Sequence, residues 1–371
     1  MKRFFKMLAV LIILVFLFGM GFLYLNPQFG ARISAQEKLA YENSDQWNGK
    51  KFVNAINTEM DISLSNMPGL LKKQFSGTEG RRPEENLNIA DFDSLSWQND
   101  TLYSKLIWFG HSVGLLKMGD LNFLIDPMFG DDTAPVAPFK SARYSANALS
   151  IIDRLPPIDA VFFSHDHYDH LDYTSIKKLR AKVGHFYVPL GVGRHLERWG
   201  VPAEKITQID WWNDFNLGEV EITFVPSRHF SGRGPFDRGE SLWGGFTFIS
   251  PQMRIYWSGD SGYGPHFKEI GERLGPFDWA FVECGQYNKL WHAIHMYPEE
   301  SVQAAIDVRA ERAVPIHWGG FTLSLHTWKD PVQRFSEEAE EKGQAIVMPK
   351  LGEVVNLNSA PSGEWWWTNV E

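Results

Sequence analysis

The stretch SHDHYDH, residues 164–170, decides the interpretation of this chain, and it follows directly on the apolar run AVFF at residues 160–163. His165, His167, Asp169 and His170 stand within six residues of one another. Histidine is the commonest metal ligand in proteins, and its neutral imidazole suits zinc and similar ions. A strand that ends in such a turn can present these side chains to two different ions. The stretch therefore predicts a metal site that draws further ligands from elsewhere in the chain.

Three later residues have the same context, an apolar strand before them and small residues after them: His229, Asp260 and His317. Two-metal sites hold their ions roughly 3.5–4 Å apart and need about six or seven protein ligands. The four groups of the first stretch and these three reach that number. We therefore predict seven metal ligands: His165, His167, Asp169, His170, His229, Asp260 and His317.

The composition is that of a globular protein, with 44% hydrophobic and 22% charged residues among 371. The formal net charge is −9, and no acidic residue precedes Glu37. An acidic chain argues against nucleic acid as the main partner, because binding a phosphate backbone requires a basic surface. The one cysteine, Cys284, excludes a disulfide within the chain and a cysteine-rich zinc site. Oligomeric state does not follow from the sequence.

Residues 7–25 contain no charge and no proline, and as a helix they would span about 28 Å, close to the thickness of the bilayer core. Lys2, Arg3 and Lys6 precede them, which predicts a cytoplasmic N-terminus with the rest of the chain on the outer face of the membrane. A cleaved signal peptide is the alternative. The long apolar run and the context NPQF at residues 26–29 favour an uncleaved anchor.

We predict four segments: an anchor or uncleaved signal at 1–30, an N-terminal extension at 31–100, a hydrolase domain at 101–358 and a tail at 359–371. Within the domain we expect two successive sets of short strands, with helices between the strands of each set. Two sheets packed face to face with helices outside would bury the apolar residues of these strands. We therefore predict an α/β (α+β) protein. The tail contains Trp365, Trp366 and Trp367, whose role the sequence leaves open.

The motifs together resemble the metallo-β-lactamase superfamily, and within it the branch of N-acylphosphatidylethanolamine-hydrolysing phospholipase D and its bacterial relatives. The resemblance extends from about residue 106 to 351. It is carried by WFGHS (108–112), IDPMF (125–129), FSHDHYDH (163–170), VPSRHFSGR (225–233), GDSGY (259–263), HMYPEE (295–300) and IHWG (316–319).

This resemblance implies a four-layer αββα sandwich with the site at one edge and two divalent ions, with zinc as the expected metal. It assigns His165, His167 and His229 to the first metal and Asp169, His170 and His317 to the second, with Asp260 bridging both. The expected catalytic residues are Asp169, Asp260 and His295, the last as donor to the leaving group. We expect Asp126, at a strand end, to orient a ligand imidazole.

The expected reaction is hydrolysis of a phosphodiester by a metal-bridging hydroxide, with a phospholipid of the N-acylethanolamine type as substrate. Hydrolysis of a carboxylic ester, lactone or β-lactam with the same site is the alternative, because a fold hosts several chemistries. A binding protein without activity would lack ligands, and none is missing here. Residues 283–295 depart from the phospholipase pattern, so the substrate stays open.

Several histidines have no assigned role at this point. His111, in a Gly-His-Ser turn, is expected to support a ligand and not to be one. For His292 two interpretations stay open, an exposed loop residue or a contact with the substrate. His185, His195, His266 and His326 are read as ordinary structural residues, and Asp172 as a helix N-cap.

Overall fold

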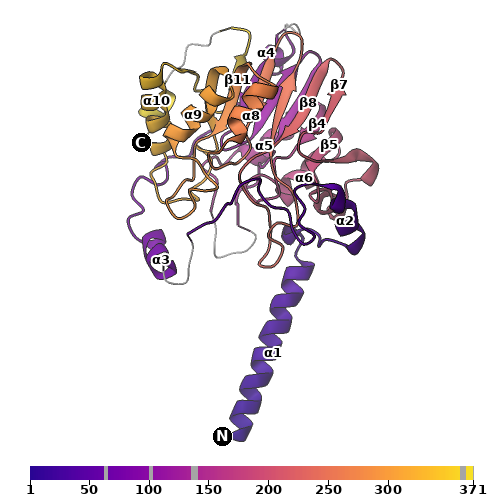
Figure 1. Ribbon diagram of the computed structural model, residues 1–371. Helices are drawn as coiled ribbons and strands as arrows, with labels where there is room; N and C mark the ends of the chain where they lie inside the picture. The colour runs from indigo at the N-terminus through magenta and orange to yellow at the C-terminus, as the bar shows by residue number, and fades with distance from the viewer. Residues whose placement is uncertain (62–65, 100–102, 135–140, 360–364, 371) are drawn as a thin grey trace.

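Two seven-stranded sheets form the core of the computed structural model, which describes residues 1–371 apart from 62–65, 100–102, 135–140, 360–364 and 371 (Figure 1). The first sheet contains β1 (Lys105–Trp108), β2 (Gly114–Met118), β3 (Leu121–Ile125), β4 (Ile158–Phe162), β5 (Val183–Pro189), β6 (Ile206–Ile209) and β14 (Val354–Asn356). The second contains β7 (Asp214–Leu217), β8 (Val220–Val225), β9 (Gly245–Ile249), β10 (Arg254–Trp257), β11 (Phe277–Glu283), β12 (Ala310–Ile316) and β13 (Ala345–Ile346). Their orders are β14-β1-β2-β3-β4-β5-β6 and β13-β12-β11-β10-β9-β8-β7.

The strand directions bring many loops to one edge of the sandwich. In the first sheet, β3, β4, β5 and β6 pair in parallel, and two antiparallel steps through β2 give β1 the same direction. In the second sheet, β10, β11 and β12 are parallel, and β8 shares their direction through β9. The carboxyl ends of these strands therefore lie together, where ligand sites of open sheets usually form.

Helices cover the sheets and complete the predicted four layers. After the extension, the helices are α5 (Ala148–Ile151), α6 (Tyr173–Leu179), α7 (Gly193–Arg198), α8 (His266–Arg273), α9 (Pro298–Asp307) and α10 (Asp330–Lys342). α7 contacts β6, α9 packs on β11 and β12, and α10 packs on β13, while Figure 1 shows α8, α9 and α10 grouped on one side of the molecule. Asp172 caps α6 by accepting a hydrogen bond from the Ser175 N–H, as predicted.

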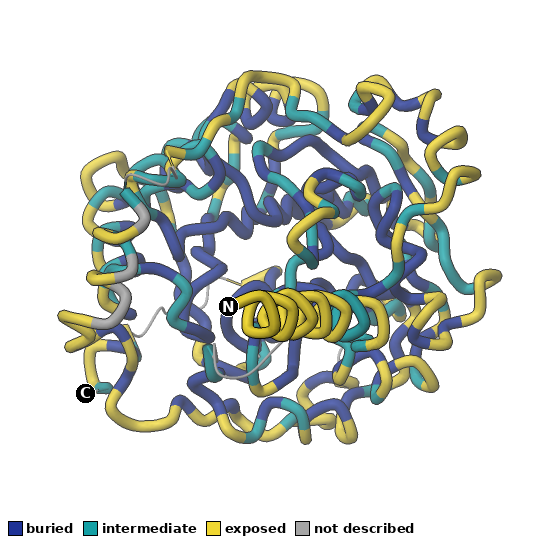
Figure 2. The backbone as a smooth tube through the Cα atoms, turned by 90° about the horizontal axis from the view of Figure 1, so that it is seen from below, coloured by how far each residue is buried: buried dark blue, intermediate teal, exposed yellow. Residues whose placement is uncertain are grey.

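The N-terminal part consists of one long helix and a series of short ones. They are α1 (Lys2–Leu25), α2 (Ala35–Ala40), α3 (Met67–Phe75) and α4 (Ser94–Gln98), with 3₁₀ turns η1 (Pro27–Phe29) and η2 (Tyr41–Asn43). None of the side chains of α1 is buried, and Figure 2 shows it exposed along most of its length. By length and composition α1 could cross a membrane or serve as a signal sequence.

The extension lies against the sandwich. Tyr41, Trp47 and Phe52 are buried and pack edge to face or tilted against one another. The backbone N–H of Phe52 donates to the Gly239 carbonyl at 2.8 Å. The predicted boundary at residues 100 and 101 lies outside the described residues.

The tail is partly packed into the fold, because the Trp367 side chain is fully buried and the Trp366 ring stacks on that of Trp318, centroids 5.6 Å apart. Two further 3₁₀ turns are η3 (Ala203–Lys205) and η4 (Trp366–Asn369). The sequence pattern missed β7, β13 and β14. β13 and β14 are two and three residues long, too short for an alternating pattern to be visible, whereas β7 alternates over four residues, DFNL, and was overlooked.

Candidate metal centre

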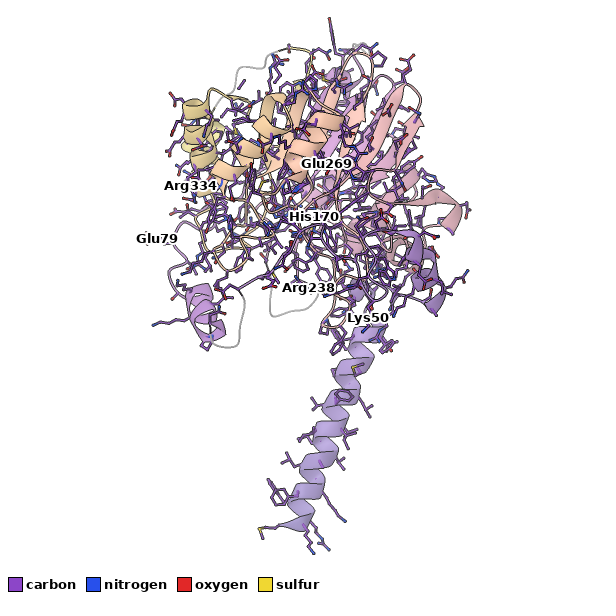
Figure 3. The ribbon with its side chains drawn as sticks, viewed as in Figure 1. Lys50, Glu79, His170, Arg238, Glu269 and Arg334 are labelled. Carbon is purple, nitrogen blue, oxygen red and sulfur yellow. The ribbon has the colours of Figure 1, made fainter. Side chains whose placement is uncertain are left out.

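All seven side chains predicted as ligands meet at the edge where the strands end. His165, His167, Asp169 and His170 lie in the loop after β4, His229 follows β8, Asp260 follows β10 and His317 follows β12. Figure 3 shows His170 at the end of the sheets, on the side of the molecule from which α1 leaves. Residues distant in the chain are thus brought into one buried cluster.

Three imidazoles form the first part of the cluster. His167 Nδ1 lies 2.9 Å from His165 Nε2 and 3.1 Å from His229 Nε2. The other nitrogen of His229, Nδ1, is 3.0 Å from the Ile294 carbonyl, to which it donates. That bond leaves Nε2 of His229 without a proton in the neutral ring, with its lone pair facing the other two imidazoles.

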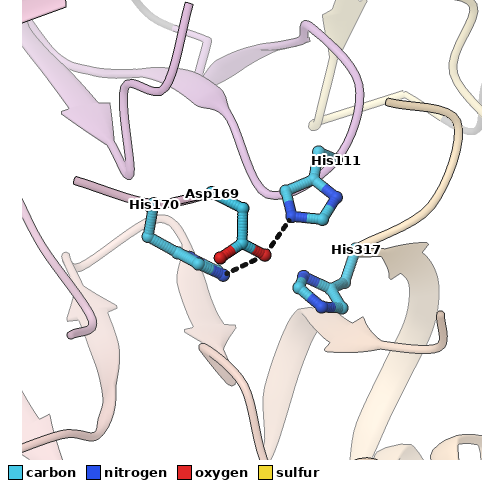
Figure 4. A group of neighbouring side chains, drawn as sticks. All are labelled: His111, Asp169, His170 and His317. Atoms are coloured by element: carbon cyan, nitrogen blue, oxygen red, sulfur yellow. Dashed lines mark hydrogen bonds and ion pairs between the residues drawn. The ribbon is translucent and has the colours of Figure 1, made fainter. Parts of the chain in front are cut away.

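The second part contains Asp169, His170 and His317 together with His111 (Figure 4). Asp169 Oδ2 is 2.8 Å from His111 Nε2 and 3.6 Å from His170 Nε2. The rings of His111 and His317 lie 4.1 Å apart between centroids. His111 therefore contacts a predicted ligand directly and belongs to the same group of possible ligand atoms, so its supporting role stays a prediction.

Asp260 lies between the two parts. Its Oδ2 is 3.2 Å from His170 Nε2 and 3.8 Å from Nε2 of both His165 and His229. Its Oδ1 is 3.1 Å from His317 Nδ1. One carboxylate therefore faces imidazoles of both parts, as a bridging group must.

Asp126 holds the loop after β4 in place. Its carboxylate accepts from the Ser164 N–H and Oγ–H, both at 2.7 Å, and lies 3.0 Å from His170 Nδ1. By accepting the Nδ1 proton it directs Nε2 of His170 toward Asp260. This contact is the one predicted for Asp126.

Burial sets the charges of the cluster. It lowers the pKa of His165, His229 and His317, and neighbouring imidazoles add to the effect. Burial also raises the pKa of Asp260 to about 6. These three imidazoles are therefore neutral with free lone pairs, whereas the neighbouring carboxylates, that of Asp260 first among them, raise the pKa of His170 well above its usual value.

The residues present fit divalent cations. Among the described atoms, His170 Nε2, Asp260 Oδ1 and His317 Nε2 are buried without a hydrogen-bond partner. In the described part of the chain, the ion-pair partners of Asp126, Asp169, Asp260 and Glu283 are all imidazoles. Buried carboxylates require a positive partner, and the ligand atoms in each of the two parts lie within 4.8 Å of one another.

The predicted catalytic residue His295 lies beside the cluster. Its ring centroid is 5.0 Å from that of His229 and 5.2 Å from that of His317. Its Nδ1 is 2.8 Å from Glu283 Oε2. His292, by contrast, is half-exposed and contacts Glu300 at 2.8 Å, away from the cluster.

Sequence reasoning missed Glu283 and Asn54. Glu283 ends β11 in the same manner as the ligands that follow β10 and β12, which is the signal that could have found it. Asn54 holds His229 from the extension: its Nδ2 donates to the His229 carbonyl at 2.8 Å, and its Oδ1 accepts from the His229 N–H at 3.1 Å. Asn54 and His229 are far apart in the sequence, so no local sequence pattern predicts their contact.

A pocket of about 410 Å³ opens beside His229, lined in part by Lys51, Phe230 and Arg238. The Arg238 guanidinium lies 3.7 Å from the centroid of the Phe230 ring, which itself lies 4.5 Å from that of His167. Among the described interactions, Arg238 has no carboxylate partner, although the exposed residue Glu59 also lines the pocket. A cationic side chain thus lines the same pocket as His229 and stacks on a ring that contacts His167.

Comparisons with known proteins show the family of the chain. The model of the beta-lactamase superfamily domain matches residues 121–318. An uncharacterized protein of Mycobacterium tuberculosis is 38% identical over 275 residues, 73% of either chain. An N-acyl-phosphatidylethanolamine-hydrolyzing phospholipase D of Caenorhabditis elegans is 30% identical over 290 residues, 73% of this chain and 79% of its own. The structure of a metallo hydrolase from the archaeon Ignicoccus hospitalis superposes with a TM-score of 0.53 at 19% identity, over 68% of this chain and 97% of that one.

Proposed function

The chain belongs to the beta-lactamase superfamily and is a metal-dependent hydrolase, and from this premise we propose that it cleaves a phosphodiester bond in a membrane phospholipid of the N-acylphosphatidylethanolamine type. The observation that supports the hydrolytic site is the convergence of seven ligand-type side chains in one cluster, five of them buried and two, His167 and Asp169, partly exposed. The support for the substrate class is the similarity to the phospholipase D of Caenorhabditis elegans.

In this proposal His165, His167 and His229 hold one divalent ion, Asp169, His170 and His317 hold a second, and Asp260 contacts both. Zinc is the metal we favour, since imidazole-rich sites with carboxylates suit it. Bound divalent cations supply a nucleophilic water of lowered pKa and positive charge for the oxyanion that develops during attack. Asp126 and Asn54 keep His170 and His229 oriented for this role.

His295 is proposed to protonate the leaving alcohol. Burial raises the pKa of the Glu283 carboxyl well above its usual range and lowers the pKa of His295. The pair is therefore neutral, and the Glu283 hydroxyl donates to Nδ1 of His295, which leaves the proton of the neutral ring on Nε2. When Nε2 gives its proton to the developing alkoxide, Nδ1 takes the proton of the Glu283 carboxyl, so that a neutral imidazole and a carboxylate remain.

Arg238 is proposed to bind the anionic part of the substrate. A phosphodiester carries a negative charge close to the scissile bond, whereas a neutral ester or lactone does not. A guanidinium suits phosphate oxygens because of its planar set of donors. Arg238 stacks on Phe230 without using its N–H groups, and the Phe230 ring in turn contacts that of His167.

Membrane anchoring by α1 is part of the proposal. The helix is long and apolar enough to span a bilayer, and Lys2, Arg3 and Lys6 favour a cytoplasmic N-terminus with the hydrolase domain outside. The cluster lies at the end of the sandwich from which α1 leaves (Figure 3). The bilayer and its phospholipids are then the partner nearest to the site.

The test is a substrate panel with the full-length, zinc-loaded protein in vesicles that contain N-acyl phosphatidylethanolamine. We expect release of phosphatidic acid, and little turnover of carboxylic esters, lactones or β-lactams. Turnover of a neutral ester with no phosphatidic acid release would replace the phosphodiesterase proposal by the esterase alternative.

A matched pair of variants tests the role of Arg238. Arg238→Gln should raise KM for the phosphodiester about tenfold, because a charge-assisted contact contributes about 1.5 kcal/mol or more. The control is Arg273→Gln, since Arg273 also stacks on an aromatic ring, that of Trp212 at 3.5 Å, but lies on the exposed surface of α8. An equal change of KM in both variants would argue against phosphate recognition by Arg238.

A further inference from the structure

We infer that residues 26–33, where the chain leaves α1, are a positioning element of the metal centre, so that α1 is retained as an anchor and the ligand loop is tied to the membrane exit. The inference rests on the proposed function for the identity of the site as a metal centre. Its evidence is a set of hydrogen bonds between this exit segment and two buried side chains, Arg233 and His195.

Arg233 joins the exit segment to the ligand loop. The guanidinium is buried, with 2% of the side chain exposed. Its Nε and Nη2 donate to the Gln28 carbonyl at 3.0 and 2.8 Å. Its Nη1 donates to the carbonyls of Asp166 and Leu171 at 2.6 and 2.7 Å. Because the two latter residues enclose His167, Asp169 and His170, one side chain closes the ligand loop and binds it to the exit segment.

His195 makes a second connection to the same loop. Its Nδ1 accepts from the Ala31 N–H at 3.0 Å, and its Nε2 lies 3.5 Å from Asp166 Oδ2. Asp166 is held in turn by the Gly232 N–H and by Ser241 Oγ, both at 2.7 Å. Asp166 thus serves as the internal support of the ligand loop, although it is not itself a predicted ligand.

The exit segment fits its place closely. Gly30 is buried with φ +65°, and a Cβ at this position would lie 1.9 Å from His195 Nδ1. Trp199 Nε1 donates to the Pro27 carbonyl at 2.8 Å, and Arg194 Nε donates to the Ala31 carbonyl at 3.1 Å. This segment is therefore built into the domain and is not a free linker.

Cleavage of the chain in the small-residue stretch 31–35 would remove the Gln28 carbonyl and the segment around it. Two donors of the buried Arg233 would then lose their acceptor, which is costly for a charged group. Retention of α1 avoids that loss. A pocket at the exit is lined by three basic residues, Arg32, Lys38 and Arg198, against two acidic ones, Asp237 and Glu240, and by the exposed Phe236, and such a basic and aromatic surface suits a bilayer.

The consequence for function is that the site cannot move freely relative to its membrane. A rigid exit segment keeps the ligand edge at a fixed height above the bilayer that holds α1. The enzyme then acts on lipids of its own membrane in preference to lipids of a facing membrane or dispersed substrate.

The first test is the intact mass of the full-length protein purified from membranes in detergent, together with its metal content. We expect the mass of the whole chain. A metal-loaded, active protein whose chain begins between residues 32 and 36 would overturn the inference.

The second test measures metal affinity by competition with a chelator, without any substrate. Gly30→Ala should lower the affinity about tenfold, the size typical of changes to groups that support ligands. Gly119→Ala is the control, since Gly119 also has φ +59° but a Cβ there would meet nothing within 4 Å. Equal affinities in the two full-length variants would refute the coupling.

A third pair covers the case in which Gly30→Ala fails to fold. Arg233→Gln should lower metal affinity about tenfold, whereas Arg254→Gln should not. Arg254 likewise donates to backbone carbonyls, those of Pro276 and Leu274, but far from the ligand loop. Equal loss in both variants would mean a general effect on stability and would contradict the inference. Because the readout is metal binding, its result is independent of which ester the enzyme cleaves.

Discussion

The two sheets supply the candidate ligands in different ways. The first sheet provides four of them in one loop after β4, and Asp126 and Arg233 hold that loop through contacts with its own backbone and side chains. The second sheet provides one ligand after each of β8, β10 and β12. Two of these have a partner from a distant segment, Asn54 for His229 and Ser112 for His317, while Asp260 contacts the other candidate ligands themselves.

The difference shows two ways to preorganise a site. A dense loop can be oriented by one or two supporting side chains, so a single substitution there should disturb several ligands at once. Ligands at separate strand ends depend on the packing of the whole sandwich, so the loss of one support should disturb one ligand only. The following variants test this contrast.

The largest effect is expected for Asp260→Asn, because this residue faces imidazoles from both sheets. The amide keeps the shape but removes the charge that two cations would share. We expect hydrolysis to fall about 10³-fold, with loss of at least one bound metal by elemental analysis. Asp120→Asn, at an exposed turn, is the control, and unchanged turnover in Asp260→Asn would exclude a bridging role.

Asp126→Asn should have the next largest effect. An amide at this position places a donor against the Ser164 N–H or the His170 Nδ1 proton, so the dense loop loses its support. Metal affinity should fall roughly 10–100-fold, and isothermal titration should show both ions affected. Loss of one ion alone would show that the loop does not act as a unit.

Asn54→Ala should have a smaller and more local effect. It removes two hydrogen bonds to the backbone of His229, each of which contributes about 1 kcal/mol. We expect the free energy of unfolding to fall by about 2 kcal/mol and only the ion held by His229 to bind more weakly. Asn57→Ala removes just an exposed contact with Glu59 and is the matched control.

The smallest effect concerns pH. Burial, with Arg194 nearby, lowers the pKa of His195 to about 3 in the folded state, against about 6.5 in the unfolded chain. As the pH falls, His195 is protonated in the unfolded chain before it is protonated in the folded protein. The free energy that the neutral, buried His195 adds to stability is therefore complete above pH 6.5 and is lost as the pH falls toward 3. Between pH 7 and 5.5 we expect a loss of about 1 kcal/mol.

His195→Asn should flatten this pH dependence, because the amide oxygen can accept from the Ala31 N–H without titrating. Urea unfolding of the metal-loaded protein at several pH values measures it. An identical slope in the variant would show that other groups cause the acid sensitivity.

The same contrast explains what could be predicted from the sequence. The ligands in the loop after β4 can be predicted because they are close together in the sequence. His229, Asp260 and His317 can be predicted because each follows an apolar run that is typical of a buried strand. Glu283 was missed because a lone carboxylate after a strand is ambiguous without its neighbours. Asn54, His195 and Arg233 act through backbone contacts with segments far away in the chain, and such contacts leave no local pattern.

Trp366 and Trp367 illustrate the same limit. The sequence alone leaves the role of these tail tryptophans open. The structure places Trp367 in the interior and Trp366 on Trp318, the residue that follows His317. Only the three-dimensional path of the chain brings the tail to the neighbour of a candidate ligand.

The pairing of β1 with β14 has a consequence for biosynthesis. Lys105 and Asn356 are register partners, so the first sheet gains its outer strand only when nearly the whole chain has been made. At about 5–20 residues per second, β1 therefore keeps an unpaired edge for more than ten seconds after it leaves the ribosome. An open edge of this kind invites intermolecular pairing. Efficient production of this enzyme should accordingly depend on a chaperone that shields the nascent chain until its last strand arrives.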